Sequence, residues 1–197
     1  KELEEACTVS PADPRSLGSF YEMAVEFVDC SIGEPFLVPD FAAVAERFVK
    51  GGAWLSFTTN GLLMAEERYG PLLGRKGRIC VSLDAPDPAT YAWYRGGGFD
   101  RLVGNVRRLC ELRNSRGGMP EVYIACLAMR SNSSRVSEVM KLAADMGADG
   151  FLLRSLYSEN RLVRPSAERG GHYFDYDHER LDLGALLDLA ERLRPLA

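Results

Sequence analysis

The sequence predicts an α/β fold, in which short β-strands alternate with α-helices around a parallel sheet. Short apolar runs of strand length recur along the chain, and the segments between them carry apolar residues at helical spacing. The chain has 197 residues and 46% hydrophobic content, which is enough for one substantial core. We therefore expect a single layered domain rather than two.

The expected strands are nearly continuous in apolar residues, which is typical of strands covered on both faces. They span residues 24–30, 53–57, 78–83, 122–128 and 151–153. The first of them is expected to be an exposed sheet edge that permits self-association.

Four expected helices present apolar stripes toward the core. The stripes are Phe41, Val44, Ala45 and Phe48; Phe99, Leu102, Val103, Val106 and Leu109; Val136, Val139, Met140 and Ala143; and Leu183, Leu186, Leu187, Ala190 and Leu193. The last helix should end before Pro195. Residues 157–182 show no clear period, so they form either a long excursion over the mouth of the fold or a link to a further element.

Composition excludes several classes of function. The net charge is −4, and the 24 basic residues are spread along the chain, so we expect no nucleic-acid partner. No apolar run approaches the roughly 20 residues that span a bilayer, and residues 1–5 are charged where a signal peptide would be apolar. These features favour no membrane association, a cytoplasmic location, and a small or peptide-like substrate.

Neither the cysteines nor the histidines have the spacing of a metal site. The five cysteines include no close pair, and Cys30, Cys80 and Cys126 lie in strand-like runs where a thiol acts as a small buried hydrophobe. His172 and His178 could be drawn with Asp175 and Asp177 as a metal site, yet they lack helical ligand spacing. We expect no metal ligand in this chain.

Polar residues follow every expected strand. The segments are Ser31-Ile32-Gly33-Glu34-Pro35, Thr58-Thr59-Asn60-Gly61, Ser82-Leu83-Asp84-Ala85-Pro86, Arg130-Ser131-Asn132 and Arg154-Ser155. In parallel α/β folds ligands bind at the carboxyl ends of the strands. These segments are therefore the predicted binding site.

Taken in order, these segments resemble the radical S-adenosylmethionine (radical SAM) superfamily. The similarity is closest to its peptide- and protein-modifying branch, whose members often carry an added C-terminal cluster domain of the SPASM type. It rests on residues 32–41, 58–61, 81–88, 94–99, 105–109 and 129–132, and on the run to about Arg154. Residues 20–155 match best, and residues 156–197 form an excursion and a C-terminal helix within one partial core domain, 1–197.

The resemblance implies a partial (βα)6 TIM-like barrel with outer helices, here missing its first βα unit. In the family a Cys-x-x-x-Cys-x-x-Cys segment binds a [4Fe-4S] cluster that reductively cleaves SAM. The resulting 5′-deoxyadenosyl radical abstracts hydrogen from a peptide, protein or related substrate. This chain has no such triplet, so the cluster ligands are expected upstream, outside the chain, and the fragment is expected to be inactive, without a catalytic residue of its own.

The resemblance also assigns cofactor contacts. Gly33, Glu34 and Pro35 would lie along the methionine amino group of SAM, and Pro35 would fix the turn. Ser82 and Asp84 share one strand face, so Asp84 would accept from ribose hydroxyls, with loop capping as its alternative. The remaining expected contacts are Thr59, Asn60, Arg95, Ser131 and Arg154. Alternatives are that Asn60 shapes its loop, Arg95 is a solvated loop residue, and Ser131 and Asn132 cap a helix that begins there.

Two other interpretations stay open. An α/β-barrel lyase or aldolase needs a lysine at a strand end, whereas Lys1, Lys50, Lys76 and Lys141 are expected in helices or loops. A degenerate binding module would keep the SAM pocket without chemistry. Sequence alone does not separate this module from part of an active enzyme.

Overall fold

A computed structural model describes residues 20–28, 33–156, 166–169 and 172–196. Its main sheet has five parallel strands in the order β1-β2-β3-β4-β5, so neighbours in the chain are neighbours in space. The strands are β1 (Glu26–Val28), β2 (Trp54–Thr59), β3 (Gly77–Ser82), β4 (Glu121–Ala128) and β5 (Gly150–Ser155). The expected α/β class is confirmed. The first strand begins at Glu26, two residues later than expected, and residues 29 and 30 lie outside the described part of the chain.

All four expected helices are present. They are α4 (Phe41–Lys50), α7 (Phe99–Ser115), α8 (Val136–Asp145) and α10 (Leu183–Leu193). The shorter elements were missed: α3 (Phe20–Met23), η1 (Pro35–Leu37), α5 (Glu66–Tyr69), η2 (Gly70–Leu72), α6 (Pro88–Arg95), α9 (Tyr176–Glu179) and η3 (Arg194–Leu196). A helix of one or two turns is too short to show an apolar stripe, and α6 buries only Tyr91 and Tyr94. None of the described helices is long and apolar enough to cross a lipid bilayer.

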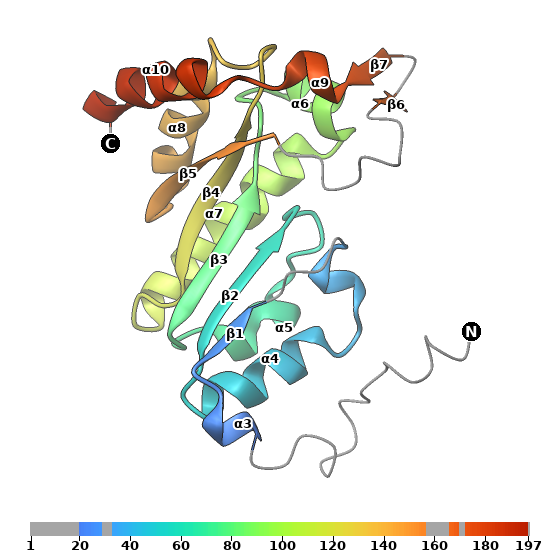
Figure 1. Ribbon diagram of the computed structural model, residues 1–197. Coiled ribbons are helices and arrows are strands. Elements are labelled where there is room, and N and C mark those ends of the chain that lie inside the picture. The colour runs from blue at the N-terminus through green and yellow to red at the C-terminus, as the bar shows by residue number, and fades with distance from the viewer. Residues whose placement is uncertain (1–19, 29–32, 157–165, 170–171, 197) are drawn as a thin grey trace.

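The main core lies between one face of the sheet and the helices that follow the strands (Figure 1). Alternate strand residues supply it, because successive side chains point to opposite faces. The strand residues in this layer include Leu55, Phe57, Ile79, Val81, Val122 and Ile124, each at most 1% exposed. The helices bury Ala45, Leu102, Val106, Leu109, Val136 and Val139 against them.

The opposite face of the sheet differs from the expectation that both faces are covered. Trp54, Ser56, Arg78, Ser82 and Tyr123 on this face are all partly exposed in the described part of the chain. The expected strands looked continuously apolar in the sequence because tryptophan, cysteine and tyrosine count as apolar. This classification concealed the alternation of buried and partly exposed residues along each strand. We call this the open face.

The segment after β5 crosses the carboxyl ends of the strands. Its described part contains an antiparallel pair, β6 (Ser166–Arg169) and β7 (His172–Asp175), followed by α9 (Figure 1). An isolated antiparallel bridge joins Met129, just after β4, to Arg180. For the described residues of the segment 157–182, this arrangement favours an excursion over the mouth of the fold, and residues 157–165 and 170–171 lie outside the described part.

Candidate cofactor-binding site

The predicted site residues gather at the carboxyl ends of the strands in two hydrogen-bonded clusters. The first, the Glu34 cluster, joins the loops after β1 and β2 and consists of Glu34, Thr59, Asn60, Gly61 and Asn105. The second, the Asp84 cluster, joins β3, β4, α6 and α9 and consists of Asp84, Tyr94, Arg95, Ser131, Asn132 and Glu179.

Glu34 connects its own loop to the end of β2. Its Oε1 accepts from the Thr59 hydroxyl at 2.6 Å and from the Phe36 amide at 3.3 Å, and its Oε2 accepts from the Asn60 amide at 2.7 Å. Pro35 begins η1, for which Glu34 is the N-cap. All these donors are neutral, and Glu34 has no ion pair within the described residues. No positively charged side chain in the described part of the chain therefore pairs with the Glu34 carboxylate.

The Thr59-Asn60-Gly61 turn is fixed by its own side chains and by α7. The Thr59 hydroxyl accepts from the Gly61 amide at 3.0 Å, and Asn60 Oδ1 accepts from the Leu62 amide at 2.9 Å. Asn105 Nδ2 donates to the Gly61 carbonyl at 2.8 Å. No role was predicted for Asn105 from the sequence. An amide side chain next to the core-facing stripe of a helix is nevertheless a signal that it bonds to a neighbouring loop.

Asp84 is buried, and both its oxygens have protein partners. Arg95 donates to Oδ2 through Nε and Nη2, each at 2.6 Å, and the Leu127 amide donates to Oδ1 at 2.8 Å. The carboxylate is 2% exposed. Arg95 ends α6 and is one-quarter exposed, so the solvated-loop interpretation of this residue is wrong. The Asp84–Arg95 ion pair thus links β3, β4 and α6. This structural role is close to the loop-capping alternative for Asp84.

Asn132 is buried and does not cap a helix. It donates through Nδ2 to the Asp84 carbonyl at 3.1 Å and the Leu127 carbonyl at 2.9 Å, and accepts from the Met129 amide at 2.8 Å. The expectation that a helix begins at Ser131 and Asn132 is wrong, because turns fill this stretch and α8 begins at Val136. The turn is stabilised by these side chain–backbone bonds together with backbone bonds such as that from the Ser133 amide to the Met129 carbonyl at 2.9 Å.

Ser131 joins three segments. Its hydroxyl accepts from the Tyr94 hydroxyl at 2.8 Å and donates to Glu179 Oε2 at 2.6 Å, and its amide donates to the same oxygen at 2.9 Å. Burial raises the pKa of Tyr94, so the phenol stays protonated as a donor. Tyr94 lies in the motif run 94–99 but was assigned no contact from the sequence, and Glu179 was not identified at all.

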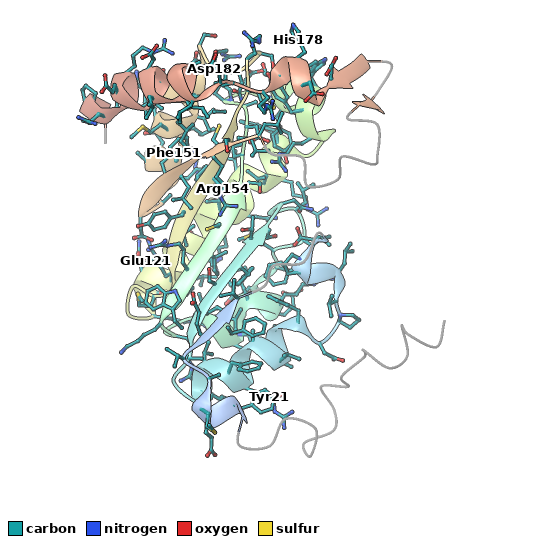
Figure 2. All side chains as sticks on the ribbon, in the orientation of Figure 1. Tyr21, Glu121, Phe151, Arg154, His178 and Asp182 are labelled. Carbon is teal, nitrogen blue, oxygen red and sulfur yellow. The ribbon has the colours of Figure 1, made fainter. Side chains whose placement is uncertain are left out.

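Three site residues keep polar groups without a partner among the described residues. They are the partly exposed Ser82 hydroxyl, the Asn60 side-chain NH2 group and the exposed Arg154 guanidinium. Arg154 lies in β5 beside Leu127 of β4 (Figure 2). Its positive charge also opposes the effect of burial, which raises the pKa of the Cys80 thiol. These groups, with Glu34, are the ones available to a polar small molecule.

The residues present do not fit an iron–sulfur cluster. Cys80, Cys110 and Cys126 are buried in different elements, and burial raises the pKa of Cys110 to about 11. Cluster ligands are thiolates. No group of three His, Cys, Asp or Glu residues that could hold a metal occurs in the described part. In the described part, Asp175 accepts from the backbone amides of Asp177 and His178, as in a local turn. Cys7, Cys30 and the His172 side chain lie outside the described part.

Known proteins similar to this chain were found by sequence and by structure, although no family model matches it. A probable GTP 3′,8-cyclase of Archaeoglobus fulgidus is 32% identical over 130 residues, covering 62% of this chain and 40% of the relative. Streptococcus suis SuiB bound to S-adenosylmethionine aligns with a TM-score of 0.71 and 17% identity, over 96% of this chain and 41% of SuiB. A radical SAM methyltransferase from Sphaerobacter thermophilus aligns with a TM-score of 0.59 and 16% identity, over 87% and 48% of the two chains.

The structural comparisons confirm the expected fold class, that of an α/β partial barrel with outer helices. The proteins to which the chain is similar are enzymes. The peptide- and protein-modifying branch is not confirmed, because the relative found by sequence is named as a nucleotide cyclase. The chain spans about 40% of the length of that relative.

Proposed function

We propose that this chain supplies the SAM-binding side of a radical SAM enzyme, whose activity requires cluster ligands from outside the chain. One observation carries the proposal: the motif residues Glu34, Asn60, Ser82, Ser131 and Arg154 lie at or just after the carboxyl ends of five neighbouring parallel strands, and so along one edge of the sheet. That edge is where α/β folds bind ligands. When bound, a reduced [4Fe-4S] cluster would supply the electron that cleaves SAM.

The charges of the site favour Glu34 over Asp84 as the contact for the positively charged methionine end of SAM. Glu34 is bonded only to neutral donors, whereas Arg95 already neutralises Asp84. A carboxylate with an uncompensated charge gains more from an ammonium group than one already paired. Ser82 and Asn60 then offer free polar groups to the adenosine part, and Arg154 offers a cation to the carboxylate.

For the substrate, we propose the nucleotide class first and the peptide class second. The relative found by sequence is named a probable GTP 3′,8-cyclase at 32% identity. SuiB, which has also been solved with its precursor peptide SuiA, is 17% identical. The larger identity favours a nucleotide, while the peptide class agrees with the motif resemblance.

Ser82→Ala is the variant that separates binding from folding. The Ser82 hydroxyl has no partner among the described residues, so its loss should leave the unfolding free energy unchanged and weaken SAM binding about threefold to tenfold, as for one lost hydrogen bond. Isothermal titration of the chain extended by its own upstream coding sequence gives the affinity. Ser134→Ala, at an exposed serine, is the control. Equal affinity of the wild type and Ser82→Ala would remove Ser82 from the site.

Anaerobic reconstitution tests the location of the cluster ligands. The 197-residue chain should take up no [4Fe-4S] cluster, whereas the extended chain should gain iron, brown colour and 5′-deoxyadenosine release together. GTP and a peptide pool, supplied separately to the extended chain, then distinguish the substrate classes by which one is consumed. A stoichiometric cluster in the 197-residue chain would contradict the proposal. An upstream sequence without cysteines would favour the degenerate binding module.

A further inference from the structure

Glu179 is a buried carboxylate that belongs to no motif in the sequence. It is the last residue of α9 and is 8% exposed. Its Oε2 accepts two hydrogen bonds from a residue 48 positions earlier, one from the Ser131 amide at 2.9 Å and one from the Ser131 hydroxyl at 2.6 Å. A buried carboxylate is costly unless it is hydrogen-bonded. Glu179 and the turn after β4 therefore hold each other in position.

The backbone around Glu179 contacts the same turn independently of the carboxylate. The Arg130 amide donates to the Glu179 carbonyl at 2.8 Å, and Arg130 Nε donates to the His178 carbonyl at 2.9 Å. Figure 1 shows α9 beyond the carboxyl ends of the central strands. The Arg130 amide bonds to the backbone of Glu179, and the Ser131 amide bonds to its side chain. The exchange rates of these two amides therefore report the two contacts separately.

The turn that Glu179 contacts is part of the proposed cofactor site. Ser131 also accepts from Tyr94 of α6, and the adjacent Asn132 donates to the Asp84 carbonyl. A change in the position of Ser131 therefore reaches the ends of both β3 and β4. Within the described residues, the Glu179 carboxylate links Ser131 of this network directly to the segment after β5.

We propose that Glu179 is a positioning residue, whose carboxylate fixes Ser131 and the turn of residues 129–132 at the carboxyl end of β4. It touches no reacting group and acts on a ligand only through Ser131. The contact itself is independent of the proposed function, but its effect on SAM binding rests on that function.

Amide hydrogen exchange of the 197-residue chain, measured residue by residue by NMR, tests the contact. In Glu179→Ala the Ser131 amide should exchange at least tenfold faster. In Glu179→Gln it should stay within threefold of the wild type, because one oxygen accepts both bonds and the glutamine amide oxygen can replace it. Glu191→Ala, at an exposed glutamate of α10, is the matched control and should change nothing at Ser131.

Titration of the extended chain with SAM tests the consequence. Glu179→Ala should weaken SAM binding about tenfold, and Glu179→Gln should restore it to within threefold. Unchanged Ser131 exchange in Glu179→Ala overturns the proposal, as does a folded Glu179→Gln variant that fails to restore protection. If Glu179→Ala does not fold, the glutamine variant alone decides. A wild type that binds no SAM refutes the proposed function, while the exchange result still decides the role of Glu179.

Discussion

The two clusters at the carboxyl edge of the sheet are built in different ways. The Glu34 cluster joins neighbouring loops through bonds to neutral groups, and its carboxylate is partly exposed. The Asp84 cluster is closed by a buried ion pair, and its hydrogen bonds join residues up to 48 positions apart. The first cluster keeps a charge available to a ligand, and the second uses its charge within the protein.

This difference separates two roles that motif residues can have. A carboxylate bonded to neutral donors can still attract a cationic ligand, whereas a carboxylate paired with arginine mainly fixes the backbone around it. Glu34 therefore belongs to the binding surface and Asp84 to its support. Four substitutions test this distinction, in order of decreasing expected effect.

Asp84→Ala should lower the unfolding free energy by about 3 kcal/mol, because it leaves the Arg95 charge without its partner and the Leu127 amide without an acceptor. Urea denaturation followed by circular dichroism measures the loss. Asp145→Ala, at an exposed aspartate at the end of α8, should change the stability by less than 0.5 kcal/mol, roughly the limit for surface sites. A loss below about 1 kcal/mol for Asp84→Ala would remove the contrast between the two clusters.

Gly61→Ala should destabilise the Glu34 cluster by about 2 kcal/mol through backbone strain and overpacking. Gly61 has a φ of +77°, and a Cβ there would lie 2.9 Å from Val81 Cγ1. Gly118 has the same φ of +77° with nothing within 4 Å of its Cβ position, so Gly118→Ala should cost only the backbone part, about 1 kcal/mol. The same denaturation experiment compares them. Equal losses would show that close packing does not constrain the turn.

The contrast between the clusters also explains what the sequence predicted. The strands and long helices were predicted from periodicity. The edge of the sheet where Glu34, Asn60, Ser82 and Arg154 lie was predicted from the rule that ligands bind at the carboxyl ends of parallel strands. These inferences need only local pattern and chain order. The Glu34 cluster lies in two such consecutive loops, so its members, apart from Asn105, were found.

The Asp84 cluster depends on contacts that no local pattern encodes. Asp84 and Arg95 were both identified, but their pairing was not, because it needs the direction and length of α6. Glu179 lies in a segment without periodicity, and its burial appears only when α9 packs beside the turn after β4. Long-range hydrogen bonds between single side chains leave no trace in a lone sequence.

The β1 edge beside the Glu34 cluster should permit association between copies of the chain. Among the described residues, β1 pairs only with β2, and Val25 and Val28 are 85% and 49% exposed. Val28→Lys should raise the concentration for half-association about tenfold, or 1.4 kcal/mol. Light scattering across a dilution series measures it. Leu187→Lys, at a similarly exposed leucine of α10, is the control. A strictly monomeric wild type at high concentration would contradict the prediction.

The smallest expected effect lies beside the Asp84 cluster, at the start of α6. Asp87 caps this helix by accepting from the Thr90 amide at 3.0 Å and the Thr90 hydroxyl at 2.8 Å, and it pairs with Arg135 Nη1 at 2.6 Å. These bonds, those from Thr90 first, lower the pKa of Asp87 to about 2. Because the folded-state pKa lies below the unfolded value of about 4, the stabilisation is complete above that pH and is lost as the pH falls toward 2.

Asp87→Asn keeps a capping oxygen and removes the charge, so it should lower stability at pH 7 by less than Asp84→Ala or Gly61→Ala does. The difference from wild type should stay constant from pH 7 to about 5 and shrink between pH 4 and 3, because the wild-type carboxylate then loses its advantage. Asp182 caps α10 through the Ala185 amide and has no ion pair in the described part of the chain, so Asp182→Asn controls for loss of a capping charge alone. Urea denaturation at pH 7, 5, 4 and 3 gives the four differences for each variant. A gap between Asp87→Asn and wild type that widens on acidification would contradict the assigned direction of the shift, and equal profiles for the two variants would show that Arg135 adds nothing to the cap.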